Sequence, residues 1–290
     1  MPGLKDVKNK IEGVKKTSQI TKAMNMVASA KLRGAQDKME RFRPYSQKFA
    51  AAMSNLSRGM DAGNLPLMEV RDVKTVEIVI VTSDRGLCGS FNSHIISTAE
   101  KLMRRIEAEG KKVTITCVGK KAHNYFKKTG KVRISYRDIM GTFQMFNARQ
   151  IAMDIAENFM VGGSDDVRLV YGKFHSIAVQ KPEVEELLPI KPVASEAATD
   201  AQITGAYTYE PEPGEIMEVL LPLYMNVQVY HAMLEVGASE HAARMTAMDN
   251  ATNACKDMIH DLTQLYNKAR QSAITSELMD IVGGAEALKG

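Results

Sequence analysis

The sequence predicts an α/β protein in which two long helices, one from each end of the chain, pair as an antiparallel coiled coil beside a small Rossmann-like α/β domain. Three observations lead to this prediction. A 3.5-residue apolar repeat fills residues 1–60, a second fills residues 213–282, and short apolar strands alternate with helices between them. We expect an N-terminal coiled-coil helix at 1–60, an inserted α/β domain with flanking links at 61–205, and a C-terminal coiled-coil helix at 206–290.

The first repeat stays in register for about eight heptads. From Leu4 to Met60, alternating steps of three and four residues reach seventeen positions, and thirteen of them are apolar. At 1.5 Å per residue this helix would be roughly 80 Å long, which is more than a globular core can cover. A second long helix must therefore lie against it.

The partner is predicted at the other end of the chain. The same walk from Ile216 reaches Ala273 with one stutter, at Gly237–His241–Met245, and the helix is expected from Pro213 to Val282. Charge supports the pairing, because residues 1–58 carry thirteen Lys/Arg against four Asp/Glu, whereas residues 210–290 carry five against twelve. Each exposed ion pair contributes only a few tenths of a kcal/mol, so charge assists a pairing that apolar contact must drive.

The middle of the chain alternates short strands with helices, which is typical of a parallel sheet covered on both faces. The expected strands are 76–81, 113–118, 131–136, 167–175 and 179–188, the last two forming a hairpin. The expected helices are 93–109, 120–128 and 148–160.

Composition excludes several classes of protein. No run approaches eighteen apolar residues, and the N-terminus shows no apolar signal core, so neither a membrane span nor a cleaved targeting segment is expected. Three scattered cysteines indicate neither a disulfide framework nor a zinc site, and no metal-ligand spacing occurs. The net charge of +4 is modest and is balanced between the two end helices, so no nucleic-acid partner is predicted.

The loop at residues 82–92 is the main candidate for chemistry. It follows a predicted strand, where a doubly wound sheet holds phosphates, but Gly86 and Gly89 do not complete a GxGxxG or P-loop motif. Cys88 lies in a turn like that of a nucleophile elbow, with His94, His123 and His175 as possible bases. An alternative function therefore stays open: a cysteine-dependent or nucleotide-binding α/β enzyme that oligomerises through its coiled coil.

Three strings of residues, in this order, resemble the gamma subunit family of F-type ATP synthases, in particular its bacterial members. The first is ITKAMNMV at 20–27, and the second is SDRGLCG at 83–89. The third and most specific comprises ASEHAARMTAM at 238–248, YNKARQ at 266–271 and the pattern that ends at Gly284-Ala285.

The resemblance implies a central rotor shaft that couples proton translocation to ATP synthesis or hydrolysis by rotation. Such a shaft has no catalytic residues, cofactor or metal of its own. The implied partners are the alpha and beta subunits of the catalytic ring, the epsilon subunit and the membrane proteolipid ring, at the cytoplasmic face of the bacterial inner membrane. The residues that match contacts to the beta subunits are Lys22, Met24, Arg244, Arg270, Gln271 and Thr275.

Two further regions follow from the resemblance. The apolar tip that would turn inside a sleeve of partner subunits comprises Ile274, Leu278, Ile281 and Val282. The foot that would meet the proteolipid ring and the epsilon subunit comprises Tyr207, Glu210 and Glu212. Polar residues at core positions of the first repeat, Ser18, Thr21 and Asn25, are expected to face the ring of partner subunits. For Lys22 and Arg244, charge pairing across the coiled coil stays an open alternative.

Overall fold

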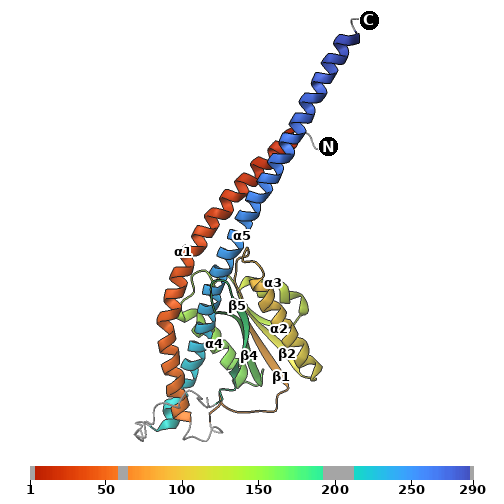
Figure 1. Ribbon diagram of the computed structural model, residues 1–290. Coiled ribbons are helices and arrows are strands. Elements are labelled where there is room, and N and C mark those ends of the chain that lie inside the picture. Colours follow the sequence, from red (N-terminus) through yellow and green to blue (C-terminus); the bar gives the residue numbers. More distant parts are fainter. Residues whose placement is uncertain (1–3, 58–64, 192–211, 288–290) are drawn as a thin grey trace. The chain divides into compact units, whose positions relative to one another are not determined.

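The computed structural model describes residues 4–57, 65–191 and 212–287. Both end helices are present: α1 spans Leu4–Ser57 and α5 spans Pro213–Ala287 (Figure 1). The predicted fold class is confirmed, and α5 continues five residues past the expected end, through Gly283 and Gly284. The chain divides into two compact units, Met1–Ala28 with Met245–Gly290 and Ser29–Arg244.

In the first unit, the start of α1 packs along the second half of α5. The less exposed residues of α1 fall on the predicted repeat, with Val7, Thr21 and Ala28 the most buried. On α5 the pattern is the same from Met248 until Ala273, and every described residue after Ala273 is exposed. The 3.5-residue repeat therefore identified the buried stripes correctly.

The expectation for the polar core residues of α1 was wrong. The Thr21 hydroxyl lies 2.8 Å from the Thr252 hydroxyl, and the Asn25 side-chain amide donates to the Met245 carbonyl at 2.9 Å. Both residues therefore face α5, because a polar group between two helices is stabilised by a partner on the opposite helix. Ser18 is half-buried, and its carbonyl accepts from the Thr21 hydroxyl. The two interhelical contacts also show that α1 and α5 run antiparallel.

The second unit is built on a five-stranded sheet in the order β3-β2-β1-β4-β5. The first four strands are parallel, and β5 pairs with β4 as the predicted antiparallel hairpin. The strands are β1 Thr75–Val81, β2 Lys112–Val118, β3 Val132–Tyr136, β4 Asp166–Phe174 and β5 Gln180–Leu188. The strand β1 has six consecutive buried residues, as expected for the centre of a sheet that is covered on both faces.

Helices cover the two faces of this sheet (Figure 1). They are α2 Phe91–Ala108, α3 Lys120–Phe126 with the short 3-10 turn η2 Lys127–Thr129, and α4 Met145–Met160. α4 begins three residues earlier than expected because the Gln144 backbone N–H bonds to the Asn147 side chain, which closes a capping box. Right-handed crossovers place α2 and α3 on one face and α4 on the other.

One segment of α5 in the second unit is buried on all sides. Every residue from Ala232 to Glu240 is buried. This segment packs both on the sheet domain and on α1, where Met39 forms an apolar cluster with Leu234 and Ala238. This segment of α5 is therefore part of the core of the second unit.

Candidate functional site

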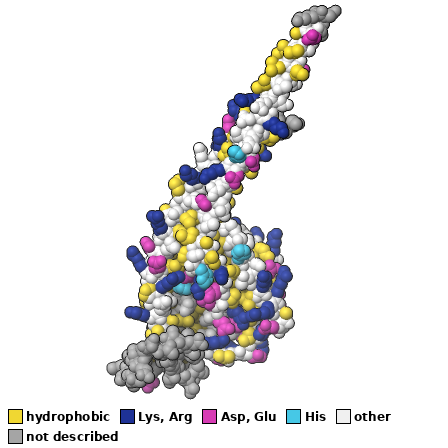
Figure 2. All heavy atoms as spheres, viewed as in Figure 1, with side chains coloured by type: hydrophobic (Ala, Val, Ile, Leu, Met, Phe, Trp, Pro, Cys, Tyr) yellow, Lys and Arg dark blue, Asp and Glu magenta, His cyan; other side chains and the backbone are white. Residues whose placement is uncertain are grey.

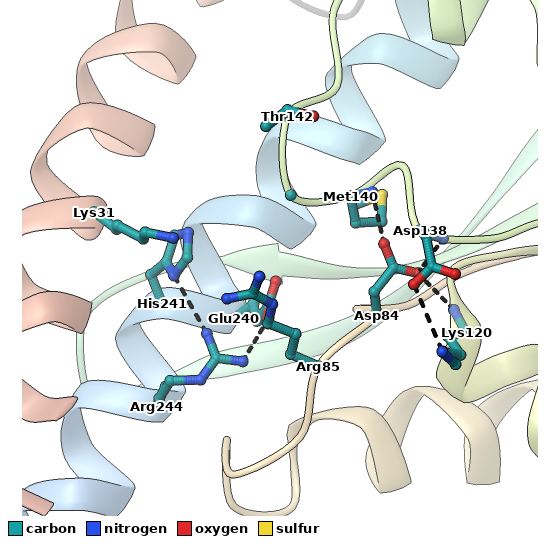
Figure 3. Close-up of a pocket in the computed structure, with 11 residues that line it drawn as sticks. Lys31, Asp84, Arg85, Lys120, Asp138, Met140, Thr142, Glu240, His241 and Arg244 are labelled. Carbon is teal, nitrogen blue, oxygen red and sulfur yellow. Dashed lines mark hydrogen bonds and ion pairs between the residues drawn. The ribbon is translucent and has the colours of Figure 1, made fainter. Parts of the chain in front are cut away.

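The loop between β1 and α2 is held in place by one carboxylate. Asp84 Oδ1 accepts hydrogen bonds from the backbone N–H groups of Lys120 and Asp138, and Oδ2 accepts one from Met140 (Figure 3). The three distances are 2.8, 3.0 and 2.8 Å. These donors lie after β2 and β3, at the carboxyl edge of the sheet, where an open α/β sheet binds its ligand. A side chain of the loop therefore already takes up three backbone donors at this edge.

Cys88 does not have the surroundings of a nucleophile. Its side chain is buried, and burial raises the pKa of the thiol above its ordinary value. The Asn92 amide donates to Sγ at 3.1 Å, and the charged groups that act on the thiol in the described chain are Arg244 and Glu240 rather than a histidine. A protonated, buried thiol is unreactive, so this geometry does not support the cysteine-dependent alternative.

A pocket of about 410 Å³ lies between this loop, α1 and α5. Four cations line it, from four different segments: Lys31, Arg85, Lys120 and Arg244. Arg244 donates to the Gly86 carbonyl through Nε and Nη2 at 3.3 and 3.0 Å, and Nη2 also bonds to Glu240 at 2.5 Å. Lys31 and Arg85 are exposed. The carboxylates of Asp84, Asp138 and Glu240 line the same pocket, and Lys120 and Arg244 pair with Asp138 and Glu240. The exposed Lys31 and Arg85 are therefore the cationic groups that an acidic partner could contact.

His241 lines this pocket, and burial is the main cause of a lowered pKa of its side chain. Burial, together with the charges of Arg244, Lys31 and Arg85, lowers the pKa of its imidazole to about 4 (Figure 3). Three cations from three segments of the chain act on this ring, so the local field opposes a further positive charge. His241 is therefore neutral at physiological pH.

This shift predicts a pH dependence of stability. The unfolded chain protonates His241 near pH 6.5, and the folded chain does so only near pH 4. The contribution of neutral His241 to the free energy of unfolding is therefore fully present above pH 6.5 and is lost as the pH falls towards 4. With allowance for solvent screening, the loss is about 1–3 kcal/mol. Urea unfolding of the His241→Gln variant should show a smaller decrease in the free energy of unfolding between pH 7.5 and 4.5 than wild type. His94→Gln, an exposed change on α2, is the matched control; an equal decrease in wild type and His241→Gln would contradict the prediction.

The structure places the predicted contact residues at three locations. Arg270, Gln271 and Thr275 lie exposed within about one and a half turns of α5. Lys22 is exposed and Met24 is half-buried, both on α1. Arg244 lies in the second unit with only 11% of its side chain exposed, and its ion pair is with Glu240 on the same helix rather than across the coiled coil. Contact of these residues with other subunits stays a prediction.

The predicted tip is an exposed apolar segment in the first unit. The exposed fractions of Ile274, Leu278, Ile281 and Val282 are 49, 56, 67 and 56%, and Figure 2 shows hydrophobic side chains along these last turns of α5. Met279, which the sequence analysis did not single out, is 68% exposed and belongs to the same segment. Apolar side chains gathered on a solvent-exposed helix mark a surface that another protein covers.

Little of the predicted foot can be described. Glu212 is exposed and directly precedes α5, and its carbonyl accepts from the Ile216 N–H. Tyr207 and Glu210 lie outside the described residues.

The cationic residues Lys31, Arg85 and Lys120 were missed by sequence reasoning. They are far apart in the chain, and each lies in a stretch that reads as an ordinary solvated helix or loop surface. The one available signal was the basic residue within the string SDRGLCG, beside a candidate ligand-binding loop. Among the described residues, no group of three or more potential metal ligands is present, and no helix has the length and apolar character to cross a bilayer.

Comparison with known proteins agrees with this architecture. The family model described as ATP synthase matches residues 3–288. The ATP synthase gamma chain of Desulfotalea psychrophila is 63% identical over 290 residues, and that of Nitratidesulfovibrio vulgaris strain Miyazaki F is 54% identical over 293 residues. Each of these alignments covers 100% of both chains.

Solved structures show the same fold. A chain of the Tetrahymena thermophila mitochondrial ATP synthase central stalk and c-ring has a TM-score of 0.61 at 27% identity, with 80% of this chain and 99% of that chain covered. A chain of the Euglena gracilis mitochondrial ATP synthase has a TM-score of 0.69 at 23% identity, with 98% and 94% covered. On the family model and the full-length bacterial relatives, the chain belongs to the ATP synthase gamma chain family.

Proposed function

We propose that this chain is the central rotor shaft of an F-type ATP synthase and couples proton translocation to ATP synthesis or hydrolysis by rotation. Members of its family are non-catalytic subunits of that complex. The observation that carries the proposal is the end of α5, where the coiled-coil burial pattern stops at Ala273 and an exposed apolar segment continues. This segment suits an axle end that turns in a sleeve, because apolar contact has no preferred direction.

A shaft of this kind acts by asymmetry. A pair of helices inside a ring with repeated catalytic sites presents a different surface to each site. A partner shifts a conformational equilibrium only through contacts that differ between the states. Rotation exchanges these contacts, so each catalytic site in the ring passes through the states in turn, while the shaft performs no chemistry.

The beta subunits are the proposed partners of the polar residues near the tip and of the cationic pocket. Arg270, Gln271 and Thr275 are exposed on α5 and available for contact. On α1, Lys22 and Met24 are the proposed contacts. The cations Lys31 and Arg85 beside Arg244 support an acidic partner surface at the pocket, since opposite charges favour and orient an encounter.

The proposed division of labour follows the three parts of the chain. Residues 1–60 and 206–290 form the shaft, and residues 61–205 form the inserted domain. The foot residues Tyr207, Glu210 and Glu212 are proposed to meet the proteolipid ring and the epsilon subunit. These contacts would hold the chain peripherally at the cytoplasmic face of the bacterial inner membrane.

Single-molecule rotation tests the proposal. The chain is assembled with the alpha and beta subunits of the same bacterium, and a bead is attached to the sheet domain through Lys128→Cys, an exposed position after α3. Addition of ATP should drive stepwise rotation in one direction. The same complex without ATP is the control. A complex that hydrolyses ATP at full rate while the bead stays still would refute the shaft function.

A further inference from the structure

The contact between α5 and the sheet domain is mostly apolar. Met225, Val229, Met233 and Val236 of α5 belong to the same buried cluster as the strands. Apolar packing opposes separation of the surfaces, but it is not directional. A shaft that carries torque needs contacts that also resist rotation and sliding, and side chains bonded to the backbone of a neighbouring element supply such contacts.

Glu235 is the first such contact. Its side chain is fully buried, and Oε2 accepts a hydrogen bond of 2.8 Å from the backbone N–H of Phe174, the last residue of β4. A buried carboxylate is costly to desolvate, so its presence among apolar residues requires compensating partners. The backbone N–H of Phe174 is a fixed donor on the sheet, so it holds this point of α5 in one position and one orientation.

The other carboxylate oxygen of Glu235 joins a third element. Oε1 lies 3.5 Å from Arg43 Nη2 on α1 and 3.4 Å from His231 Nε2, one turn earlier on α5. One buried side chain therefore links α1, α5 and β4, all within the second unit.

Ser239 repeats the contact one turn after Glu235. Its hydroxyl donates to the Gly172 carbonyl at 3.1 Å, and the side chain is fully buried. Residues four apart share one face of a helix, so both bonds reach β4 from the same side of α5. The backbone of β4 is itself fixed here, because a Cβ at Gly172 would come within 2.4 Å of the Phe91 ring on α2.

We propose that Glu235 and Ser239, with Arg43, form a polar clamp that holds α5 against rotation and sliding on the sheet domain, so that torque passes between the two. The inference rests on the proposed shaft function and assigns it positioning residues distinct from the subunit contacts. Arg244, which bonds to Gly86, lies close by, but it is kept unchanged in the test because it is a proposed contact of the beta subunits.

The test uses the assembled rotary complex and the bead assay described above. In the double variant Glu235→Leu with Ser239→Ala, both bonds to β4 are lost and Arg43 remains exposed to solvent, so no buried charge is left unpaired. Replacing a buried ionic group by an apolar one of similar size is often tolerated. We expect the rate of ATP hydrolysis to stay at the wild-type level, while the angular spread of the bead during a catalytic pause becomes severalfold wider.

Two variants make the result specific. Glu235→Gln keeps an oxygen that accepts from the Phe174 N–H, so its angular spread should stay close to that of wild type. Arg104→Met, which breaks an exposed ion pair with Glu100 on α2, controls for loss of a polar contact elsewhere. If the double variant does not assemble, Ser239→Ala alone carries the test and should widen the spread by a smaller factor.

The outcomes separate the clamp from the shaft function. If wild type rotates and the double variant has the same angular spread as wild type, the clamp is overturned and the shaft function stands. An equally wide angular spread in Glu235→Gln and in the double variant would also overturn the clamp, because the hydrogen bonds to β4 would then not hold α5 in place. Wild type that hydrolyses ATP without rotating would refute the shaft function, and the clamp with it.

Discussion

Truncation of the chain after Ala273 is expected to reduce torque and proton coupling strongly while leaving the second unit folded. The deletion removes residues 274–290, including the four apolar tip residues, and no residue of the Ser29–Arg244 unit. Burial of one large aliphatic side chain contributes about 1.5–3 kcal/mol, so contact with a sleeve would lose several times that amount. Torque is measured from the rotation rate of a bead under viscous load, and coupling from ATP-driven proton uptake.

A second variant separates the effect of the length of α5 from the effect of its apolar tip. Replacing Ile274, Leu278, Ile281 and Val282 together by Gln keeps the helix length and should give most of the same loss. The matched control changes exposed polar residues of the same segment, Glu277→Gln with Asp280→Asn, and should rotate like wild type. Full torque and coupling in the truncated chain would show that these last turns are not a bearing surface.

Alanine at Gly119 is expected to destabilise the sheet domain by about 4 kcal/mol or more. Gly119 joins β2 to α3 with φ 98° and ψ 147°, a conformation that is essentially restricted to glycine. A Cβ there would lie 2.1 Å from the Thr82 carbonyl oxygen, and backbone cannot move aside as a flexible side chain can. The measurement is the free energy of unfolding in urea, followed by circular dichroism.

Gly110→Ala is the matched control for this prediction. Gly110 also has a positive φ, of 78°, but a Cβ there would meet no atom within 4 Å. The Gly110→Ala substitution should lower the free energy of unfolding by only about 1 kcal/mol, because alanine adopts a positive φ less readily than glycine. If the two variants lose similar amounts of unfolding free energy, the close approach of Gly119 to Thr82 does not explain the effect of Gly119→Ala.

The long helices were predictable because their information is local and repeated. From Val7 to Leu56, the positions of the apolar repeat coincide with the less exposed residues of α1. They do so because residues spaced by a 3.5-residue period lie on one face of a helix. The same reasoning failed at Thr21 and Asn25. A polar residue at a core position faces either outward or a polar partner, and the partners Thr252 and Met245 are more than 200 residues away.

The sheet was predictable from its alternating strands and helices, but the pocket beside it was not. Lys31, Arg85 and Arg244 come together because the loop after β1 packs beside α5, and no sequence period records that contact. The buried pair Glu235 and Ser239 was equally hidden, since each reads as one more polar residue within a helix. Contacts between segments distant in the chain determine these features, and they emerge only once the chain is folded.

The carboxylate of Asp84 has a consequence for regulation in the cell. A doubly wound domain that lies within an ATP-converting machine could in principle sense the very molecules that the machine handles. In this chain a side chain of the loop already bonds to the backbone donors at that edge of the sheet. A nucleotide could use these donors only by displacing the Asp84 carboxylate, so regulation by ADP or ATP at this edge would have to overcome three hydrogen bonds.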